Sequence, residues 1–528
     1  MSPRLLLAAC LTAALCPAQG DFAFDKATTA PLGGQLKLDY SGAPGNQTLL
    51  FAASLNGGPT PLKLLFGGSD TRSIQVGVDL ISAWVLTATT PSGAGSFLIG
   101  VPNDTALQGL PIHTQLLTGP GNPNLVDKIS NDLVLVAGAH GTVDPLLAKL
   151  GDGRSPKGPG RALMSVVPIQ GSAGEFLIAG GGTGNILSAQ GLNTSEVFDT
   201  RSLQIRAGPN MTVARALHTT TVLSNGRVLL CGGVDALGAT QNTCELYDPN
   251  TNTFTATGSM SIARAGHAAA LLSDGRVLVA GGASNLSDIL SAINSFLNTA
   301  EIYNPTTGTW SAANSIADKL LAPALTTLPN GRVLLSGGAK VNFIFGIPTS
   351  VTTVSNCQLF DPTNGNWSST GAMRQHRGVH SLNTILLTDG RVLVTGGVEV
   401  NIPLLPPPTT LAGAKATAKA EFYNASSGTW TALPDLPTAS TGHGAQQMPN
   451  GSVLLTGGAS GAIDAAVSHD TVLEFSPATN TYVRSFKLNT ARATHGVALL
   501  PDGNLVVFGG ANSATATAVL DTLEMVHQ

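Results

Sequence analysis

A pair of adjacent glycines recurs seven times between residues 180 and 510, at steps of 49 to 61 residues. Each pair has another glycine six residues earlier, and in six of the seven units Asn or Asp precedes that glycine, as in SDGRVLVAGG. Asn-Gly or Asp-Gly between apolar runs favours a type I′ hairpin turn, because both central residues need a positive φ. Each unit is therefore predicted to contain a strand a, a tight turn and a strand b. The pairs that end strand b are Gly180-Gly181, Gly232-Gly233, Gly281-Gly282, Gly337-Gly338, Gly396-Gly397, Gly457-Gly458 and Gly509-Gly510.

A third strand, c, follows a loop of variable length, as in CELYDP, AEIYNP and AEFYNA. A turn rich in Pro, Asn, Thr and Gly then leads to strand d, which carries one large aromatic residue. Four strands per ~50 residues is the arithmetic of a β-propeller blade. The last unit has only three strands, so we expect the segment before repeat 1 to supply the fourth, with Ser130–Gly138 as a candidate. The aromatics of strand d are Phe254, Trp310, Trp367, Trp430 and Tyr482.

The combination of a glycine pair, a Glu-x-Tyr-Asp strand and a spaced aromatic resembles the kelch repeat, over about residues 155–528. The resemblance implies an all-β fold: a seven-bladed kelch-type β-propeller of the galactose oxidase-like kind, with its blades packed radially about a channel. Repeat 1 departs from the pattern because it lacks the Asn/Asp-Gly turn and has Ile205 at the aromatic position. In repeat 6, Glu474 is shifted by one residue.

The region before the repeats divides into three parts. Residues 1–18 have the charged start, apolar centre and small-residue end of a secretory signal peptide. Residues 21–138 show short apolar runs between Gly, Pro and Asn clusters, which favours a small β-sandwich-like domain. Residues 139–160 are typical of a linker, and the propeller occupies 161–528. We therefore expect an exported, bacterial-type kelch protein that is secreted, periplasmic or at the cell surface.

The charge of the chain excludes some classes of partner. Charged residues make up 11% of the chain, against roughly 25% in an average soluble protein. The net charge of −4 provides no basic surface for nucleic acid. After the signal peptide, no apolar run approaches the ~18–20 residues of a membrane span. We expect a monomer whose partner is neither nucleic acid nor a membrane.

The glycine pairs have two interpretations. A phosphate-binding loop needs a strand, a Gly-rich turn and a helix whose N-terminal amides face the anion. Here a strand follows each pair, and no GK[ST] motif is present. Since one pattern recurs in every unit, we interpret the pairs as a structural requirement for close approach of backbones, which Gly permits.

Arg and His residues recur at a fixed distance before the hairpin turn. Strand a begins on the face where strand b ends, so these residues could form a rim around the channel mouth that binds an anion or a carboxylate. The alternative is structural, because Glu245, Glu301 and Glu421 open strand c on that face and could pair with the arginines. Histidines spread around a ring lie too far apart to hold one metal, so no metal site is predicted. The rim candidates are Arg215, His218, Arg264, His267, Arg377, His380, His443, Arg492 and His495.

Three cysteines remain after the signal peptide, and they form no CxxC pair of the kind that binds zinc. Cys231 ends strand b and Cys244 begins strand c of repeat 2. In an oxidising extracytoplasmic setting the two could form a disulfide, and the alternative is two buried thiols. Cys357 of repeat 4 would lie opposite Ser336, so it is expected to be free.

The loops between strands b and c vary most in length, from 12 residues in repeat 2 to 24 in repeat 5. Repeat 3 inserts SDILSAINSFLN, whose apolar spacing and Ser/Asp start predict a short helix. Repeats 4 and 5 insert the apolar segments KVNFIFGIPTSV and VEVNIPLLPPPTTLAGAKATAK. Exposed apolar loops gathered on one face are a usual recognition surface. We therefore predict that a protein or glycan binds this b–c loop face, the alternative being that the loops pack on one another or on the N-terminal domain.

The resemblance also raises two enzymatic alternatives. Galactose oxidases use a copper radical site with a Cys cross-linked to a Tyr, a second Tyr and two His. Here the repeat accounts for Tyr247, Tyr303, Tyr423 and Tyr482, and Tyr40 lies outside the propeller, so no copper or other cofactor is expected. A carbohydrate-active epimerase or lyase would use the Arg/His rim as anion clamp and general base, although no acid–base pair can be named. The leading hypothesis is a non-catalytic binding or scaffold protein.

Overall fold

The computed structural model describes separate stretches between residues 23 and 136, and then residues 141–149, 160–172, 174–183, 189–405, 408, 410–512 and 519–528. The predicted signal peptide lies outside these residues. The described chain is all-β, with one short α-helix and two 3-10 turns among its antiparallel strands. It divides into two compact units: unit 1 is residues 1–140 with 201–203, and unit 2 is residues 141–200 with 204–528. In this described part, no helix combines the length and the apolar character that a membrane crossing needs.

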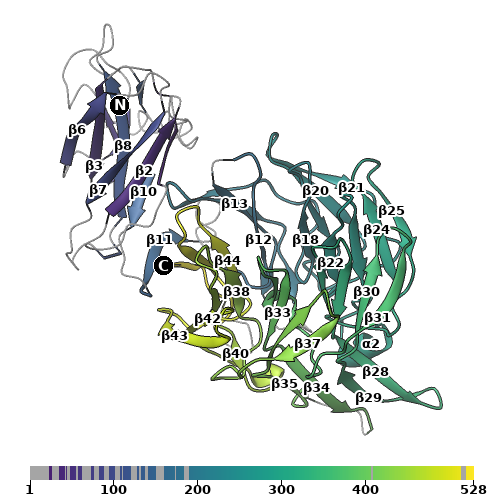
Figure 1. Ribbon diagram of the computed structural model, residues 1–528. Coiled ribbons are helices and arrows are strands. Elements are labelled where there is room, and N and C mark those ends of the chain that lie inside the picture. The colour runs from purple at the N-terminus through teal and green to yellow at the C-terminus, as the bar shows by residue number, and fades with distance from the viewer. Residues whose placement is uncertain are drawn as a thin grey trace, which may run out of the picture. The chain divides into compact units, whose positions relative to one another are not determined.

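In unit 2, repeats 1–6 each fold into a four-stranded antiparallel sheet in the order a-b-c-d (Figure 1). Repeat 1 contains β12 (Ser165–Pro168), β13 (Glu175–Ala179), β16 (Ser195–Asp199) and β17 (Gln204–Ala207). Repeat 2 contains β18 (Thr219–Val222), β19 (Val228–Cys231), β20 (Cys244–Asp248) and β21 (Thr253–Thr257). Repeat 3 contains β22 (Ala268–Leu271), β23 (Val277–Ala280), β24 (Ala300–Asn304) and β25 (Thr309–Ala313).

The next three sheets follow the same order. Repeat 4 contains β26 (Ala324–Thr327), β27 (Val333–Ser336), β30 (Cys357–Asp361) and β31 (Asn366–Thr370). Repeat 5 contains β32 (Thr384–Leu386), β33 (Arg391–Thr395), β36 (Ala420–Asn424) and β37 (Thr429–Ala432). Repeat 6 contains β38 (Gly444–Gln447), β39 (Val453–Thr456), β42 (Thr471–Ser476) and β43 (Thr481–Lys487).

The a–b hairpins lie where the sequence predicts them, but their turn type differs. In repeat 2, Gly226 N–H donates to Leu223 O and Leu223 N–H donates to Arg227 O, which makes a three-residue loop. Gly226 has φ 82°, whereas Asn225 is not among the residues with positive φ. This is a type I turn followed by a left-handed Gly, not the predicted type I′ turn. The Asn225 side chain accepts the Arg227 N–H, which explains the Asn or Asp before the glycine.

The sheet of repeat 7 is completed by a strand from before repeat 1. It contains β44 (Gly496–Leu499), β45 (Leu505–Phe508) and β46 (Thr522–Val526), and β46 also pairs with β11 (Val143–Lys149). Figure 1 shows β11 beside the C-terminus. The predicted source is thus right but the candidate Ser130–Gly138 is wrong, since β10 (Leu133–Val136) pairs with β8 in another sheet. The segment 139–160, predicted as a linker, contains β11.

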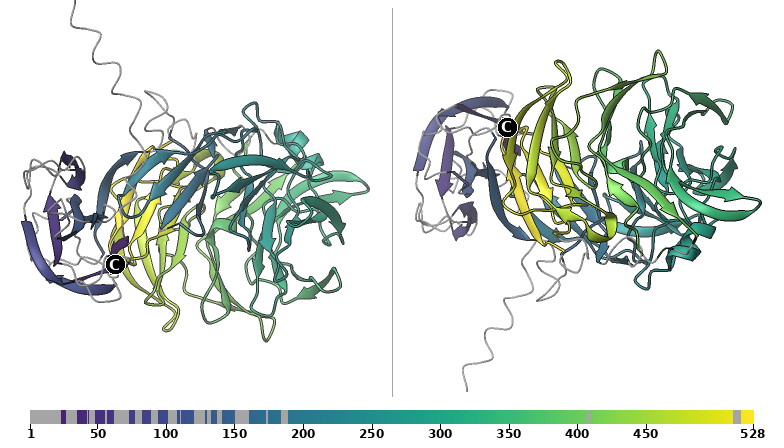
Figure 2. Two further views of the ribbon diagram at one scale, coloured as in Figure 1. Left: turned by 90° about the horizontal axis from the view of Figure 1, so that it is seen from above. Right: turned by 90° about the horizontal axis from the view of Figure 1, so that it is seen from below.

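Neighbouring repeats are joined at their first strands. β12, β18, β22, β26, β32, β38 and β44 contact one another in chain order, and β44 contacts β12. Backbone bonds run the same way: Gly266 N–H donates to Leu217 O at 3.1 Å and Ala322 N–H to Gly266 O at 2.9 Å. Leu163 N–H donates to Thr494 O at 3.0 Å and so links repeat 1 to repeat 7. In Figure 2 the colour runs around unit 2 from blue through green to yellow, as expected for sheets that follow one another in a ring.

The glycine pairs lie where two repeats meet. A Cβ on Gly232 would lie 2.4 Å from Arg264 O and 2.9 Å from the His267 ring, both in the next repeat. A Cβ on Gly233 would lie 2.5 Å from Ala216 O of its own repeat. The φ angles of the pair, 63° and 89°, are also ones that side chains disfavour. This confirms the structural interpretation of the pairs.

The b–c insertions add structure to one face of unit 2. In repeat 3 the predicted helix is confirmed as α2 (Ile289–Asn294), with Asp288 as its N-cap. The insertions of repeats 4 and 5 join in one four-stranded sheet of β28 (Ala339–Ile344), β29 (Ile347–Thr353), β34 (Val398–Pro403) and β35 (Ala414–Ala416). The minor elements are β14 (Gly182–Thr183), β15 (Gln190–Gly191), η2 (Ser381–Asn383), β40 (Ala459–Ser460), η3 (Ile463–Ala465) and β41 (Val467–Ser468).

Unit 1 contains two larger sheets and a strand pair. One sheet is β1 (Ala23–Lys26), β2 (Gln35–Ser41) and β7 (Gly95–Gly100). The other is β3 (Thr48–Ser54), β6 (Ser82–Ala88), β8 (Pro111–Gly119), β9 (Lys128–Ile129) and β10. β4 (Gly57–Pro61) pairs with β5 (Ser73–Val76). Leu38 of β2 packs with Phe51 and Leu116 of the second sheet in one apolar core, as two facing sheets require.

Candidate functional site

The arginines of the predicted rim are buried ion-pair partners. Arg264 is 0% exposed, and its Nη2 lies 2.7 Å from Glu301 Oε1. Its Nη1 donates to the carbonyl oxygens of Gly281 and Thr299 at 3.0 and 3.1 Å, so it ties the end of strand b to the start of strand c. Burial lowers the pKa of Arg264, and the Glu301 carboxylate opposes that shift. The same pairing occurs as Arg161–Glu196, Arg215–Glu245, Arg377–Glu421 and Arg492–Glu524.

Repeats 4 and 6 lack both members of the ion pair. At the positions of the Arg and the Glu, repeat 4 has Leu320 and Gln358. Repeat 6 has Ser440 and Leu473. Because a buried charge without a partner costs several kcal/mol, roughly 3–5, the two positions are expected to change together. This pattern favours a structural role for the pair.

Five histidines each connect their own repeat to the preceding one. His267 Nε2 lies 2.9 Å from Thr219 Oγ1, and His380 Nε2 lies 3.0 Å from Ser336 Oγ. Burial and, to a smaller extent, the charge of Arg377 lower the pKa of His380 to about 3. These imidazoles are therefore neutral at physiological pH. The other hydroxyl–histidine pairs are Ser165–His218, Thr395–His443 and Thr456–His495.

An exposed Arg/His rim is therefore not what the structure contains. The four arginines are 0% exposed and four of the five histidines are buried, with His218 half-buried. Their polar atoms face strands b and c or the neighbouring repeat instead of solvent. The side chains lie at the end of the sheets where the sequence predicts them, and their burial and Arg–Glu pairing match the structural alternative. The candidate residues with this placement are Arg215, His218, Arg264, His267, Arg377, His380, His443, Arg492 and His495.

The three cysteines among the described residues are buried thiols in this structure. Cys231 of β19 and Cys244 of β20 are directly opposite each other. The neighbouring Gly232 N–H donates to Thr243 O, so Cys231 and Cys244 form a non-hydrogen-bonded pair, the kind with the shorter Cα separation. A disulfide between them stays a prediction, which peptide mapping without reductant tests. Cys357 lies opposite Ser336 across β27 and β30, as predicted.

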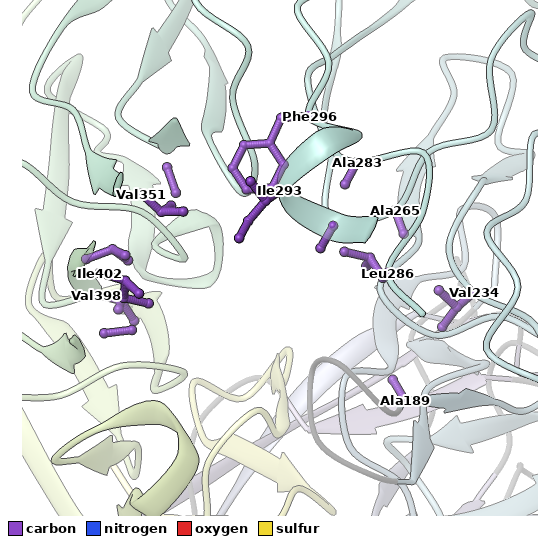
Figure 3. Close-up of a cluster of buried hydrophobic side chains, with 14 of the residues drawn as sticks. Ala189, Val234, Ala265, Ala283, Leu286, Ile293, Phe296, Val351, Val398 and Ile402 are labelled. Carbon is purple, nitrogen blue, oxygen red and sulfur yellow. The ribbon is translucent and has the colours of Figure 1, made fainter. Parts of the chain in front are cut away.

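The b–c insertions meet over one end of the repeat sheets and enclose an apolar chamber of about 130 Å³ that is partly open to the surface. One wall comes from α2 and its flanks, with Ile293 and Phe296 (Figure 3). The opposite wall comes from β29 and β34, with Val351 and Ile402. The turns before strand a also contribute side chains, including Val379. Sequence reasoning missed these turn residues. Their only signal is that the residue directly before the His varies between repeats, as in RALH, RAGH and RGVH.

A second hollow lies on the same face, between the b–c loops of repeats 1, 2 and 3. This cleft has a volume of about 580 Å³. Gln190, Thr240 and Asn285 bring amide and hydroxyl groups to it, and Val234 and Leu286 bring apolar ones. Leu237, also at the cleft, is 91% exposed. A mixed lining of this size is typical of ligand sites.

The tip of the β28–β29 hairpin is an exposed apolar surface. Phe343, Ile344 and Ile347 are each more than half exposed, and Phe345 is fully exposed. Phe345 and Gly346 form the two-residue turn, with φ of 50° and 80°. Figure 1 shows this hairpin at the edge of unit 2. We call Phe343, Ile344, Phe345 and Ile347 the hairpin tip.

Comparisons with known proteins support the kelch resemblance. A family model described as the Kelch motif matches residues 215–261 and 264–315, which are repeats 2 and 3. No match was found among curated proteins. One similar solved structure is a novel fungal alcohol oxidase with catalytic diversity among the AA5 family, in complex with copper. It is 16% identical, the match covers 70% of this chain and 74% of that one, and the TM-score is 0.52. This likeness shows the fold alone.

The residues that the structure describes do not fit a copper site of the kind that the galactose oxidase resemblance implies. Tyr303 and Tyr423 are buried, and each hydroxyl hydrogen-bonds a threonine of the preceding repeat. The oxygen–oxygen distances are 2.7 Å for Tyr303 with Thr257 and for Tyr423 with Thr370. Tyr247 bonds Asn252 in its own c–d turn. Across the described residues, His, Cys, Asp and Glu side chains form no group of three or more that could hold a metal.

Proposed function

We propose that this protein is an exported, monomeric recognition protein, built on a seven-bladed kelch-type β-propeller with an N-terminal β-sandwich-like domain. It binds a protein or glycan through the b–c loop face. The signal-peptide pattern of residues 1–18 supports export, and the ring of first-strand contacts supports the blade count.

The observation that carries the proposal is the concentration of binding features on one face. The cleft and the hairpin tip are built from segments between strands b and c, and most of the chamber lining also comes from such segments. Exposed apolar side chains that adjoin hollows are typical of interaction surfaces. In the sheets beneath, buried ion pairs tie strand c to the turn that enters the same repeat, and hydroxyl–histidine hydrogen bonds join neighbouring repeats.

The face offers groups for either class of partner. The amides of Gln190 and Asn285 and the hydroxyl of Thr240 can exchange hydrogen bonds with sugar hydroxyls or with a peptide backbone. The hairpin tip presents Phe343 and Phe345, and aromatic residues are enriched at protein interfaces. An epimerase or lyase site receives no support, because the Arg/His set that would supply its anion clamp is buried.

Single-site variants test the proposal better than removal of the repeat 5 insertion, because β34 and β35 are part of the inserted sheet. The double variant F343S/F345S removes the hairpin tip, and L237S alters the cleft. Val483→Ser is the matched control, since Val483 is 55% exposed on the outer strand β43. Binding is measured on a glycan array and by cross-linking to secreted proteins of the source cells.

We expect a partner captured by the wild type to bind at least tenfold more weakly to one of the loop variants and equally well to V483S. Equal binding by all variants would place the interaction elsewhere on the molecule. Export is checked by fractionating cells that express the chain with and without residues 1–18. Light scattering checks that the purified chain is a monomer.

A further inference from the structure

The lining of the chamber restricts what can occupy it. All of the side chains around it are apolar, contributed by the insertions of repeats 3 to 6 and by the turns before strand a. Water in a cavity needs two to four polar partners, and these side chains supply none. A sugar would leave its hydroxyl groups without hydrogen-bond partners there, at a cost in free energy for each buried group.

The backbone at the chamber does not supply the missing polar contacts. At the turns that line it, Gly266 N–H is bonded to Leu217 O, Ala322 N–H to Gly266 O and Val379 N–H to Ala322 O. These N–H and C=O groups are engaged between repeats. Leu217, Ala322 and Val379 also have positive φ, between 51° and 55°, which for a β-branched Val is an uncommon conformation.

The volume sets the size of the occupant. The chamber measures about 130 Å³, and an apolar cavity of about 150 Å³ lined by Leu, Ile and Phe stays dry and takes up benzene. The walls here are of the same kind, with Ile293, Phe296, Val351 and Ile402 (Figure 3). An uncharged group with the bulk of one aromatic ring fits this space.

We propose that the apolar chamber is a binding site for a small, uncharged hydrocarbon molecule with the bulk of one aromatic ring. This goes beyond the proposed function, because it concerns a free small molecule and needs neither the hairpin tip nor the cleft. Burial of the ligand's carbon surface supplies the affinity, and the absence of polar side chains excludes sugars and ions.

Benzene is the probe, with glucose as the polar control. We expect saturable binding of benzene to the full-length protein, seen by calorimetry, and an increase in Tm of about 1–2 °C at saturation. Glucose should give neither. Absence of saturable benzene binding would overturn the proposal.

Two substitutions that fill the chamber locate the site. Ala292 of α2 and Ala414 of β35 both line it and are about 5% exposed or less. A292L and A414L are each expected to weaken benzene binding at least tenfold, whereas A312L, on the exposed outer face of β25, leaves it unchanged. Unchanged binding in both chamber variants would place benzene elsewhere.

A second measurement covers the case in which a filled variant does not fold. Wild-type crystals soaked in bromobenzene should show an anomalous bromine peak between Ile293 and Ile402, and a peak elsewhere would contradict the assignment. The variant F343S/F345S separates this inference from the proposed function. It should lose a protein partner but keep its benzene affinity.

Discussion

Arg264 and Glu301 form a buried ion pair in which Arg264 Nη2 lies 2.7 Å from Glu301 Oε1. The pair joins the turn that enters repeat 3 to strand c of the same repeat. The carboxylate also accepts the backbone N–H of Ser261 at 2.7 Å. The pair thus fixes both strand c and the chain that arrives from repeat 2. Arg264→Leu should lower the free energy of unfolding by roughly 3–5 kcal/mol, because Glu301 would stay buried without a partner.

The double variant R264L/E301Q, which copies Leu320 and Gln358 of repeat 4, should recover most of this loss. Urea unfolding measures all three proteins, and Arg276→Ala, which removes a partly exposed ion pair, is the control with an effect of at most about 1 kcal/mol. Equal stability of R264L and the wild type would contradict a structural role for the pair.

Acid should destabilise unit 2 through its buried histidines. Burial lowers the pKa of His380 and of His443 to about 3, whereas an unfolded His has a pKa near 6.5. The unfolded chain therefore binds these protons first. The stabilisation is complete above pH 6.5 and decreases by roughly 1.4 kcal/mol per pH unit for each His as the pH falls towards 3.

Urea midpoints measured from pH 7 to pH 4 test this dependence. In His443→Gln, which keeps a polar group beside Thr395, the slope should be smaller by the contribution of one His. A slope that does not change with this substitution would mean that other groups cause the acid effect.

Two glycine substitutions should separate the free-energy cost of a steric clash at the new Cβ from the cost of placing a side chain at a positive φ. Gly232→Ala places a Cβ 2.4 Å from Arg264 O, whereas Gly451 has no atom within 4 Å of the corresponding position. Both have positive φ, so G451A measures the conformational cost alone, roughly 1–2 kcal/mol. G232A should cost clearly more, as measured by urea unfolding. Equal losses would mean that the neighbouring repeat moves aside.

The hairpin tip should be dispensable for folding. Because Phe343 and Phe345 are exposed, F343S/F345S is expected to change the free energy of unfolding by no more than about 0.5 kcal/mol. Urea unfolding beside the wild type checks this. A loss of several kcal/mol would show that the tip packs against the rest of the molecule, and the binding test would then need other variants.

The spacing of glycines and aromatics was enough to predict the four strands of repeats 1 to 6 and the three local strands of repeat 7, since these positions follow from local turn and strand chemistry. It did not predict the turn type, because Asn-Gly suits both a type I′ turn and a type I turn with a left-handed Gly. The strand that completes repeat 7 was assigned to the right region but to the wrong residues. The apolar run of Val143–Lys149 contains Pro145, and strands with Pro are harder to recognise.

The candidate site was harder to predict because burial depends on distant parts of the chain. Arg215 and Glu245 are 30 residues apart, and either exposure or pairing was consistent with the sequence. The chamber joins side chains from four insertions, which have no common motif, with side chains from the turns before strand a. Ile293 and Val351 meet there only because the repeats beneath bring their loops together.

The pairing of β11 with β46 makes unit 2 circular in topology although its chain is linear. The sheets of repeats 1 to 6 each use one continuous stretch and can form as the chain is synthesised. The sheet of repeat 7 joins residues that are far apart in the sequence. Asp144 and His527 are 383 positions apart, and His527 Nε2 lies 2.9 Å from Asp144 Oδ2. Its completion is a long-range event of the kind that slows folding. We therefore expect the β11–β46 pairing to form last during folding and to be the first contact of unit 2 to open.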